Sequence, residues 1–365
     1  SSAAGTGGTI SLFADGIDLQ TSITLDSNDG AGADVTIAGI IMDDFTDGLT
    51  IDAGAANAVL SSATLTDLDH LDVTAASLTL GDTTLGAGDN NGGDGLDVNT
   101  TGNLTLNGDI STAGEATAGA IALDGVGGTI QLNGDGANND GIVTITSDAT
   151  TAAAITIGSV DDTSEGLGLT LDAGSTATTP ATVTVTAGGI GGAGDEIGAL
   201  TIIGGTSDTS AGRIDASSVD IQADTITLGN VIDSTGTVTF HQLTNGRTIG
   251  LEDMGQQINL TDGNLDMITA PTLQIGDSNT GTIDVATDNP VSLTQASVGL
   301  TSSGAITFDA MAFSNTGNLA VNAGGDVTDN AGSVAVTGTT TLDSRTADIT
   351  LDNVANDFTG NVIVT

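Results

Sequence analysis

The chain has 365 residues and a formal net charge of −44 at pH 7, from 47 acidic and 3 basic residues. This charge excludes nucleic acid and anionic lipid as partners, because both require a basic surface. The chain has no Cys, which excludes disulfides, and no run of about 18 apolar residues that would insert into a membrane. Its mean hydropathy of +0.19 is too apolar for a disordered acidic chain.

Short runs in which apolar and polar residues alternate recur along the whole chain. Each run is bounded by Gly, Asp, Asn or Ser, which is typical of β-strands separated by tight turns. No segment shows the 3.6-residue apolar period of a helix, so we expect helix to be nearly absent. The runs that predict strands most clearly cover residues 9–13, 34–40, 48–54, 103–109, 129–135, 141–148, 181–189 and 224–229.

Similar three-residue phrases return at a nearly constant spacing. They occupy residues 78–80, 104–106, 130–132 and 155–157, at steps of 26, 26 and 25 residues. A step of 21–26 residues is typical of one coil of a parallel β-helix (β-solenoid), whose strands stack about 4.8 Å apart. We therefore predict an all-β fold of roughly 14–15 coils. Residues 1–365 are expected to form one continuous solenoid, with a change of coil shape near Gly205.

Two stretches near the C-terminus repeat each other more closely. Residues 305–321 and 348–364 are offset by 43 residues and share 8 of 17 positions. The offset is most simply two coils of 21–22 residues. The pairs Ile306/Ile349, Phe308/Leu351, Leu319/Val362 and Val321/Val364 are then equivalent apolar positions of stacked coils.

The repeats resemble those of large bacterial filamentous-haemagglutinin-like exoproteins. The resemblance implies a right-handed β-helix, secretion, and a role in adhesion, biofilm or surface filaments. It is carried by the phrases at residues 102–106, 119–123, 128–135, 258–285 and 349–362.

Calcium is the first metal to consider. Residues 92–98 resemble most of the Gly-Gly-x-Gly-x-Asp nonapeptide of calcium-binding β-rolls, with Asp94 and Asp97 as the carboxylates. The alternative is a Gly/Asp corner loop. Two further acidic clusters could hold Ca²⁺ or be solvated turn residues, and their offset of about 120 residues suggests equivalent places: Asp43, Asp44 and Asp47, and Asp161, Asp162 and Glu165.

Other motifs point more weakly to chemistry. His70 and His241, the only histidines, have no metal-ligand spacing and are expected to be surface or corner residues. Paired carboxylates raise the alternative of a polysaccharide-degrading β-helix enzyme. The chain has no Trp, Tyr or Lys to line a sugar site, so we predict a protein that is not an enzyme.

The two ends are predicted to be assembly edges, because a terminal coil offers unpaired backbone groups and apolar side chains. The edge residues are Thr9, Ile10 and Leu12 at one end, and Val362, Ile363 and Val364 at the other. The expected partner is another copy, stacked head to tail, or the continuation of a longer chain.

The expected function is that of a secreted structural protein at the cell surface or in the extracellular matrix, as a segment or subunit of an adhesin or filament. The alternative is a calcium-dependent adhesion module that binds a glycan or surface.

Overall fold

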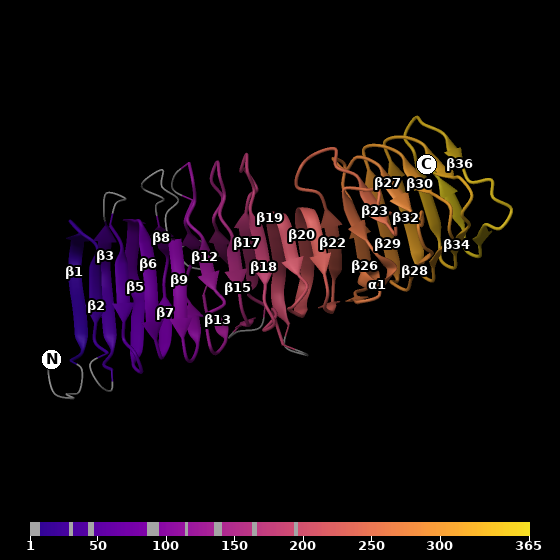
Figure 1. Cartoon of the computed structure of the whole chain (residues 1–365). Helices are drawn as coiled ribbons and strands as arrows, with labels where there is room; N and C mark the ends of the chain where they lie inside the picture. Colours follow the sequence, from indigo (N-terminus) through magenta and orange to yellow (C-terminus); the bar gives the residue numbers. More distant parts are fainter. Residues whose placement is uncertain are drawn as a thin grey trace. The chain divides into compact units, whose positions relative to one another are not determined.

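The computed structural model confirms a nearly all-β parallel solenoid (Figure 1). It describes residues 8–28, 32–42, 47–85, 95–113, 116–134, 141–162, 166–192 and 196–365. The chain divides into two compact units, Ser1–Asp215 and Ala216–Thr365, and each is described by itself. The expectation of one continuous solenoid stays a prediction. The boundary between the units lies ten residues after Gly205.

Unit 1 begins with long strands that later split in two. β1 (Ile10–Asp18), β3 (Val35–Met42) and β5 (Asn57–Leu68) pair in parallel. β7 (Ser77–Leu80) pairs with the first half of β5 and β8 (Thr83–Leu85) with the second half. Gly81 and Asp82 separate β7 from β8 and supply a turn where the earlier coils run straight.

Three ladders of parallel strands run through the rest of unit 1. The first continues from β7 through β10 (Leu104–Leu106), β13 (Ile130–Leu132) and β16 (Val160–Asp162). The second continues from β8 through β11 (Ile110–Ser111), β14 (Ile142–Thr146), β17 (Gly168–Ala173) and β19 (Ile197–Thr209). The third contains β2 (Ile23–Asp26), β4 (Leu49–Asp52), β6 (His70–Ala75), β9 (Gly95–Thr100), β12 (Ile121–Leu123), β15 (Ile155–Ile157), β18 (Thr182–Val185) and the second half of β19.

The core of unit 1 consists of apolar side chains stacked in register. On the third ladder each inward position faces the next coil, and each of these side chains is at most 2% exposed. Burying one Leu, Ile or Val contributes about 1.5–3 kcal/mol, so every coil added to a ladder stabilises its neighbours. This column comprises Leu49, Leu71, Leu96, Ile121, Ile155 and Val183.

The repeat spacing predicted two steps of the first ladder correctly and the third wrongly. Leu78 pairs with Leu104 and Leu104 with Ile130, as expected. Ile130 then pairs with Val160, after 30 residues rather than 25. Ile155 belongs to the third ladder, because inward phrases on all ladders have the same chemistry and spacing alone does not tell them apart.

Unit 2 has its own three ladders, and all its residues are described. The first contains β20 (Ile214–Leu228), β22 (Thr237–His241), β26 (Thr272–Ile275), β29 (Ser297–Ser302), β32 (Asn318–Ala323), β35 (Thr340–Asp343) and β38 (Val362–Val364). The second contains β24 (Ile258–Leu260), β23 (Ile249–Leu251), β27 (Ile283–Val285), β30 (Ile306–Phe308), β33 (Val327–Asp329) and β36 (Ile349–Thr350). The third contains β28 (Val291–Leu293), β31 (Phe313–Asn315), β34 (Val334–Val336) and β37 (Asp357–Phe358).

One segment of unit 2 departs from simple coiling. β24 follows β23 in sequence but pairs on the side of β23 opposite to β27. The chain then forms α1 (Asp262–Leu265), a four-residue helix whose N-cap is Thr261, before β25 (Ile268–Thr269) pairs with β21 (Ile232–Ser234). This excursion accounts for the 35 residues between the paired positions Val238 and Leu273.

The 43-residue offset near the C-terminus is confirmed as two coils. Ile306 pairs with Val327 and Val327 with Ile349, at steps of 21 and 22 residues. On the first ladder, Thr340 stands between Leu319 and Val362 in the same way. The aromatic pair Phe308 and Phe313, with ring centroids 5.2 Å apart, fills the interior beside these coils and is fully buried.

We expect Phe308→Ala to lower the free energy of unfolding by about 3–5 kcal/mol, because it leaves a cavity among close-packed side chains. Urea denaturation followed by circular dichroism would measure the loss. Phe13→Ala is the matched control, since Phe13 is 71% exposed and should cost well under about 1 kcal/mol. Equal losses in the two variants would contradict the burial of Phe308.

Candidate functional site

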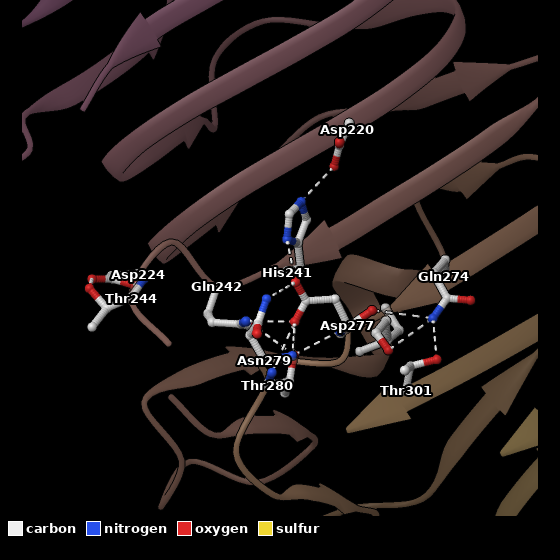
Figure 2. A network of polar contacts seen from close by, with 12 residues as sticks. Asp220, Asp224, His241, Gln242, Thr244, Gln274, Asp277, Asn279, Thr280 and Thr301 are labelled. Atoms are coloured by element: carbon white, nitrogen blue, oxygen red, sulfur yellow. Dashed lines mark hydrogen bonds and ion pairs between the residues drawn. The ribbon is translucent and has the colours of Figure 1, made fainter. Parts of the chain in front are cut away.

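A polar network in unit 2 is centred on His241, the last residue of β22 (Figure 2). Its imidazole lies between carboxylates from the two neighbouring coils. The Nε2 atom is 3.0 Å from Oδ1 of Asp220 on β20, and the Nδ1 atom is 3.5 Å from Oδ2 of Asp277, two residues after β26. The His241 side chain is only 15% exposed. One imidazole thus connects three consecutive coils.

The register of β20 and β22 brings Asp220 and His241 together. Val219 pairs with Val238, and Gln222 pairs with His241. Asp220 therefore lies diagonally across from His241 on the outward face, since alternate side chains of a strand point to the same side. The inward side chains of Val238 and Phe240 are fully buried and hold this register.

A turn of its own orients the carboxylate of Asp277. Its Oδ1 atom accepts hydrogen bonds from the backbone N–H groups of Asn279 at 2.8 Å and Thr280 at 2.9 Å. The same oxygen accepts one from Nε2 of Gln242 at 2.7 Å. Gln242 and Thr280 are buried, and the Thr280 hydroxyl donates to Oε1 of Gln242. These bonds leave Oδ2 of Asp277 facing His241.

A second carboxylate of β20, Asp224, anchors the turn that follows β22. It is 7% exposed and accepts hydrogen bonds from the backbone N–H of Thr244 at 2.8 Å and from its hydroxyl at 2.6 Å. Nε of Arg247 lies 2.9 Å from its Oδ2 atom. One of only three cationic side chains in the sequence thus neutralises a buried carboxylate, which would otherwise be costly to bury.

Burial and charge act on the protonation of His241 and Asp277 in opposite directions. Burial is the strongest single influence on His241 and disfavours its charged form, but Asp220 and Asp277 together outweigh it and raise the pKa of His241 above 6.5. For Asp277, burial alone would raise the pKa. Hydrogen bonds from Gln242 and Asn279, and then the charge of His241, lower this pKa below 3.8. The ionised pair is therefore favoured between the two pKa values.

A second polar cluster of unit 2 lies beside β27. The Nε2 group of Gln256 donates to Oδ2 of Asp284 at 2.6 Å and to Oδ2 of Asp253 at 3.0 Å. Burial, together with the charges of Asp253 and Asp309, raises the pKa of Asp284. Across the described part of the chain, no group of three or more His, Asp or Glu residues is placed to hold a metal ion. Both clusters connect segments of the chain to one another.

The acidic residues proposed as calcium ligands do not come together where the structure describes them. Asp43, Asp44 and Asp94 lie outside the described residues. Asp97 is exposed on β9, where Asp72 is its partner on the neighbouring strand. Asp161 and Asp162 lie on β16, in a different ladder, and Oδ2 of Asp162 accepts hydrogen bonds from the backbone N–H groups of Gly166 and Leu167 at 2.7 and 2.9 Å. Calcium binding stays a prediction.

The expected equivalence of the two other acidic clusters is wrong. Leu49, after the first cluster, lies on the third ladder, whereas Leu169, after the second, lies on the second ladder. Their similar phrases reflect a shared strand pattern and not a shared face of the solenoid. The clusters therefore do not occupy corresponding corners.

The predicted assembly edges lie on strands β1 and β38. Thr9 is exposed just before β1, and Ile10 and Leu12 are half-buried on it. On β38, Val362, Ile363 and Val364 are 47%, 46% and 63% exposed. Val362 pairs with the buried residue Thr340 and Val364 with the buried residue Leu342, so these two side chains continue inward columns.

The His241 network was missed from the sequence, where His241 was expected to be a surface or corner residue. Asp220 and Asp277 lie 21 and 36 residues from it, and nothing in the local sequence connects the three. An available signal was the strand period, because a His at an outward strand position has cross-strand neighbours one coil away. His70 behaves differently, since its Nδ1 atom lies 3.3 Å from Asp69, the adjacent residue.

Comparison with protein families supports a repeat protein. Residues 296–365 match a family described as repeats of unknown function (DUF5649). These residues comprise the coils from β29 to β38, where the step is shortest and most regular. No curated protein and no solved structure matches the chain. Within the described residues, no helix is long and apolar enough to cross a membrane.

We expect His241→Gln to destabilise unit 2 by about 1 kcal/mol near pH 5–6, because it removes the cation that joins Asp220 to Asp277. The folded-state pKa of His241 is raised, so its contribution is complete below the unfolded value of 6.5 and disappears as pH rises through the folded value. The pKa of Asp277 is lowered, so its contribution disappears only as pH falls below 3.8.

Urea denaturation of the wild type and the variant across this pH range would measure the difference. His70→Gln is the matched control, because the ion pair of His70 stays within one coil. A His241→Gln difference that is constant from pH 5 to pH 9 would contradict this role of the imidazole.

Proposed function

We propose that this protein is a non-enzymatic structural protein of the bacterial cell surface or extracellular matrix. It acts as a segment or subunit of an adhesin or filament whose β-coils stack on further β-coils. The observation that carries the proposal is the unbroken stacking of β29, β32, β35 and β38, with buried side chains in register from coil to coil.

The polar contacts of the protein support the same role. His241, Gln242 and Asp224 each connect one coil to another. Such contacts resist sliding and separation of coils, which is the demand on a structural element. The resemblance of the repeats to filamentous-haemagglutinin-like exoproteins supports the adhesin or filament role and secretion.

The proposed stacking surface is the open side of β38. Val362 and Val364 project in line with inward columns and are half exposed, so a further coil would bury them. The backbone groups on the open edge of a strand pair readily with another strand. The coil that covers β38 would come from another copy or from a continuation of the chain.

We expect the 365-residue chain to associate end to end as its concentration rises, in salt high enough to screen its charge. Sedimentation velocity and negative-stain electron microscopy would detect growing, unbranched particles. Val362→Lys should abolish the growth, because a charge in an inward column blocks stacking.

Ile363→Lys is the control, since Ile363 pairs with Thr341 on the outward face of the same strand. Particles of one length at every concentration, or equal growth of the wild type and Val362→Lys, would count against stacking at β38. A longer chain that stays monomeric, while this chain associates, would identify the continuation as the natural cover.

A further inference from the structure

Large apolar side chains on the surface of this acidic protein are grouped. Among the described residues, those that are exposed on β1 and β38 are Phe13 and the last three apolar residues. The remaining three are Met254, Met311 and Val354, which are 77%, 41% and 103% exposed. All three belong to unit 2, and we call them the corner ridge.

The three residues occupy one corner of the unit 2 coils. Each lies three positions after a second-ladder site, namely Leu251, Phe308 and Leu351. Leu251 pairs with Val285 and Val285 with Phe308, and the ladder continues through β33 to β36. The ridge residues therefore come from alternate coils. With strands about 4.8 Å apart, neighbouring ridge residues recur at about 9.6 Å.

The coils between them present different residues at this corner. Asp288 occupies the position between Met254 and Met311 and is exposed. Gly332 occupies the position between Met311 and Val354, where a Cβ atom would lie 2.1 Å from the backbone oxygen of Met311. A side chain is thus excluded at Gly332, and the apolar residues on either side stay separate.

Hydrogen bonds between successive turns hold the corner in place. The backbone N–H of Met254 donates to Oδ2 of Asp288 at 2.9 Å, and that of Met311 donates to the oxygen of Ala286 at 2.7 Å. Nδ2 of Asn353 donates to the oxygen of Gly332 at 3.0 Å. The backbone of the ridge is therefore ordered before any partner arrives, which lowers the entropic cost of binding.

The chemistry of the corner identifies the class of partner. Exposed carboxylates of Asp288 and Asp352 accompany the apolar side chains, and the whole chain carries a formal charge of −44. A partner must therefore supply apolar groups together with positive charge. Methionine adapts its shape to a partner and is favoured at surfaces that bind basic amphipathic helices.

We propose that the corner ridge binds a basic amphipathic helix of another protein. Residues i, i+7 and i+14 of a helix recur at about 10.5 Å on nearly the same face, close to the spacing of the ridge. Lys or Arg residues beside that face would meet Asp288 and Asp352. A second copy of this chain lacks this chemistry, because it has three basic residues and, among its described residues, one helix of four residues.

The probe is a synthetic helix of about 20 residues, built from Lys and Ala, with Leu at i, i+7 and i+14. Its affinity for the whole chain would be measured by fluorescence anisotropy at about 0.15 M salt, where charges are screened beyond roughly 8 Å. A peptide of the same composition, with the Leu residues spread around the helix, controls for charge alone. We expect it to bind at least about tenfold more weakly.

The test variant combines Met254→Ser, Met311→Ser and Val354→Ser, all at exposed positions where the fold tolerates change. It should bind the patterned peptide at least about tenfold more weakly than the wild type. The control variant combines Phe13→Ser with Ile363→Ser, which removes exposed apolar side chains elsewhere, and should bind within about twofold of the wild type.

Three results would overturn the proposal. The triple variant could bind as tightly as the wild type, or the two peptides could bind equally. Alternatively, self-association of the wild type without peptide, lost in the triple variant and kept in Val362→Lys, would assign the ridge to a second copy. Because the ridge and β38 are tested by different variants, failure here leaves the proposed stacking at β38 unaffected.

Discussion

The structure depends on parallel strands of successive coils stacking in register about 4.8 Å apart. At this spacing each inward Leu, Ile or Val lies against the same position of the next coil, and a column of small and branched side chains fills the interior without large aromatics. A slip of one residue would turn every inward side chain of a strand to the surface. The burial of Leu71, Leu96 and Ile121, each at most 1% exposed, therefore fixes the register of whole coils.

Once the register is set, outward positions also fall into columns, and these columns decide where polar groups meet. Asp220 and His241 are near each other because the columns beneath them align Val219 with Val238. The same geometry places Met254, Met311 and Val354 at one corner. In a solenoid, residues far apart in sequence thus become neighbours without a pocket or a folded active site. Polar contacts strengthen the attachment between coils, and exposed apolar residues mark a surface for contact with other molecules.

The acidic surface has to be reconciled with this regular stacking. With 47 acidic and 3 basic residues, few carboxylates can pair with a cation. The structure uses the backbone instead, as at Asp277 and Asp162, whose carboxylates accept hydrogen bonds from N–H groups in the turns they begin. Asp suits this role because its short side chain reaches the backbone two residues on. Arg247 is placed beside Asp224, a carboxylate that is 7% exposed.

The sequence by itself determined the class of fold, the near absence of helix and the two-coil offset between Ile306 and Ile349. These follow from local patterns, since the alternation of apolar residues and the turn residues repeat with each coil. Only the tertiary structure decided which ladder each strand joins, as Ile155 shows, because inward strands on all faces have the same chemistry. It also decided the His241 network and the corner ridge. Both depend on the lengths of intervening turns, such as the 35-residue step from Val238 to Leu273, and these lengths vary independently of the strands.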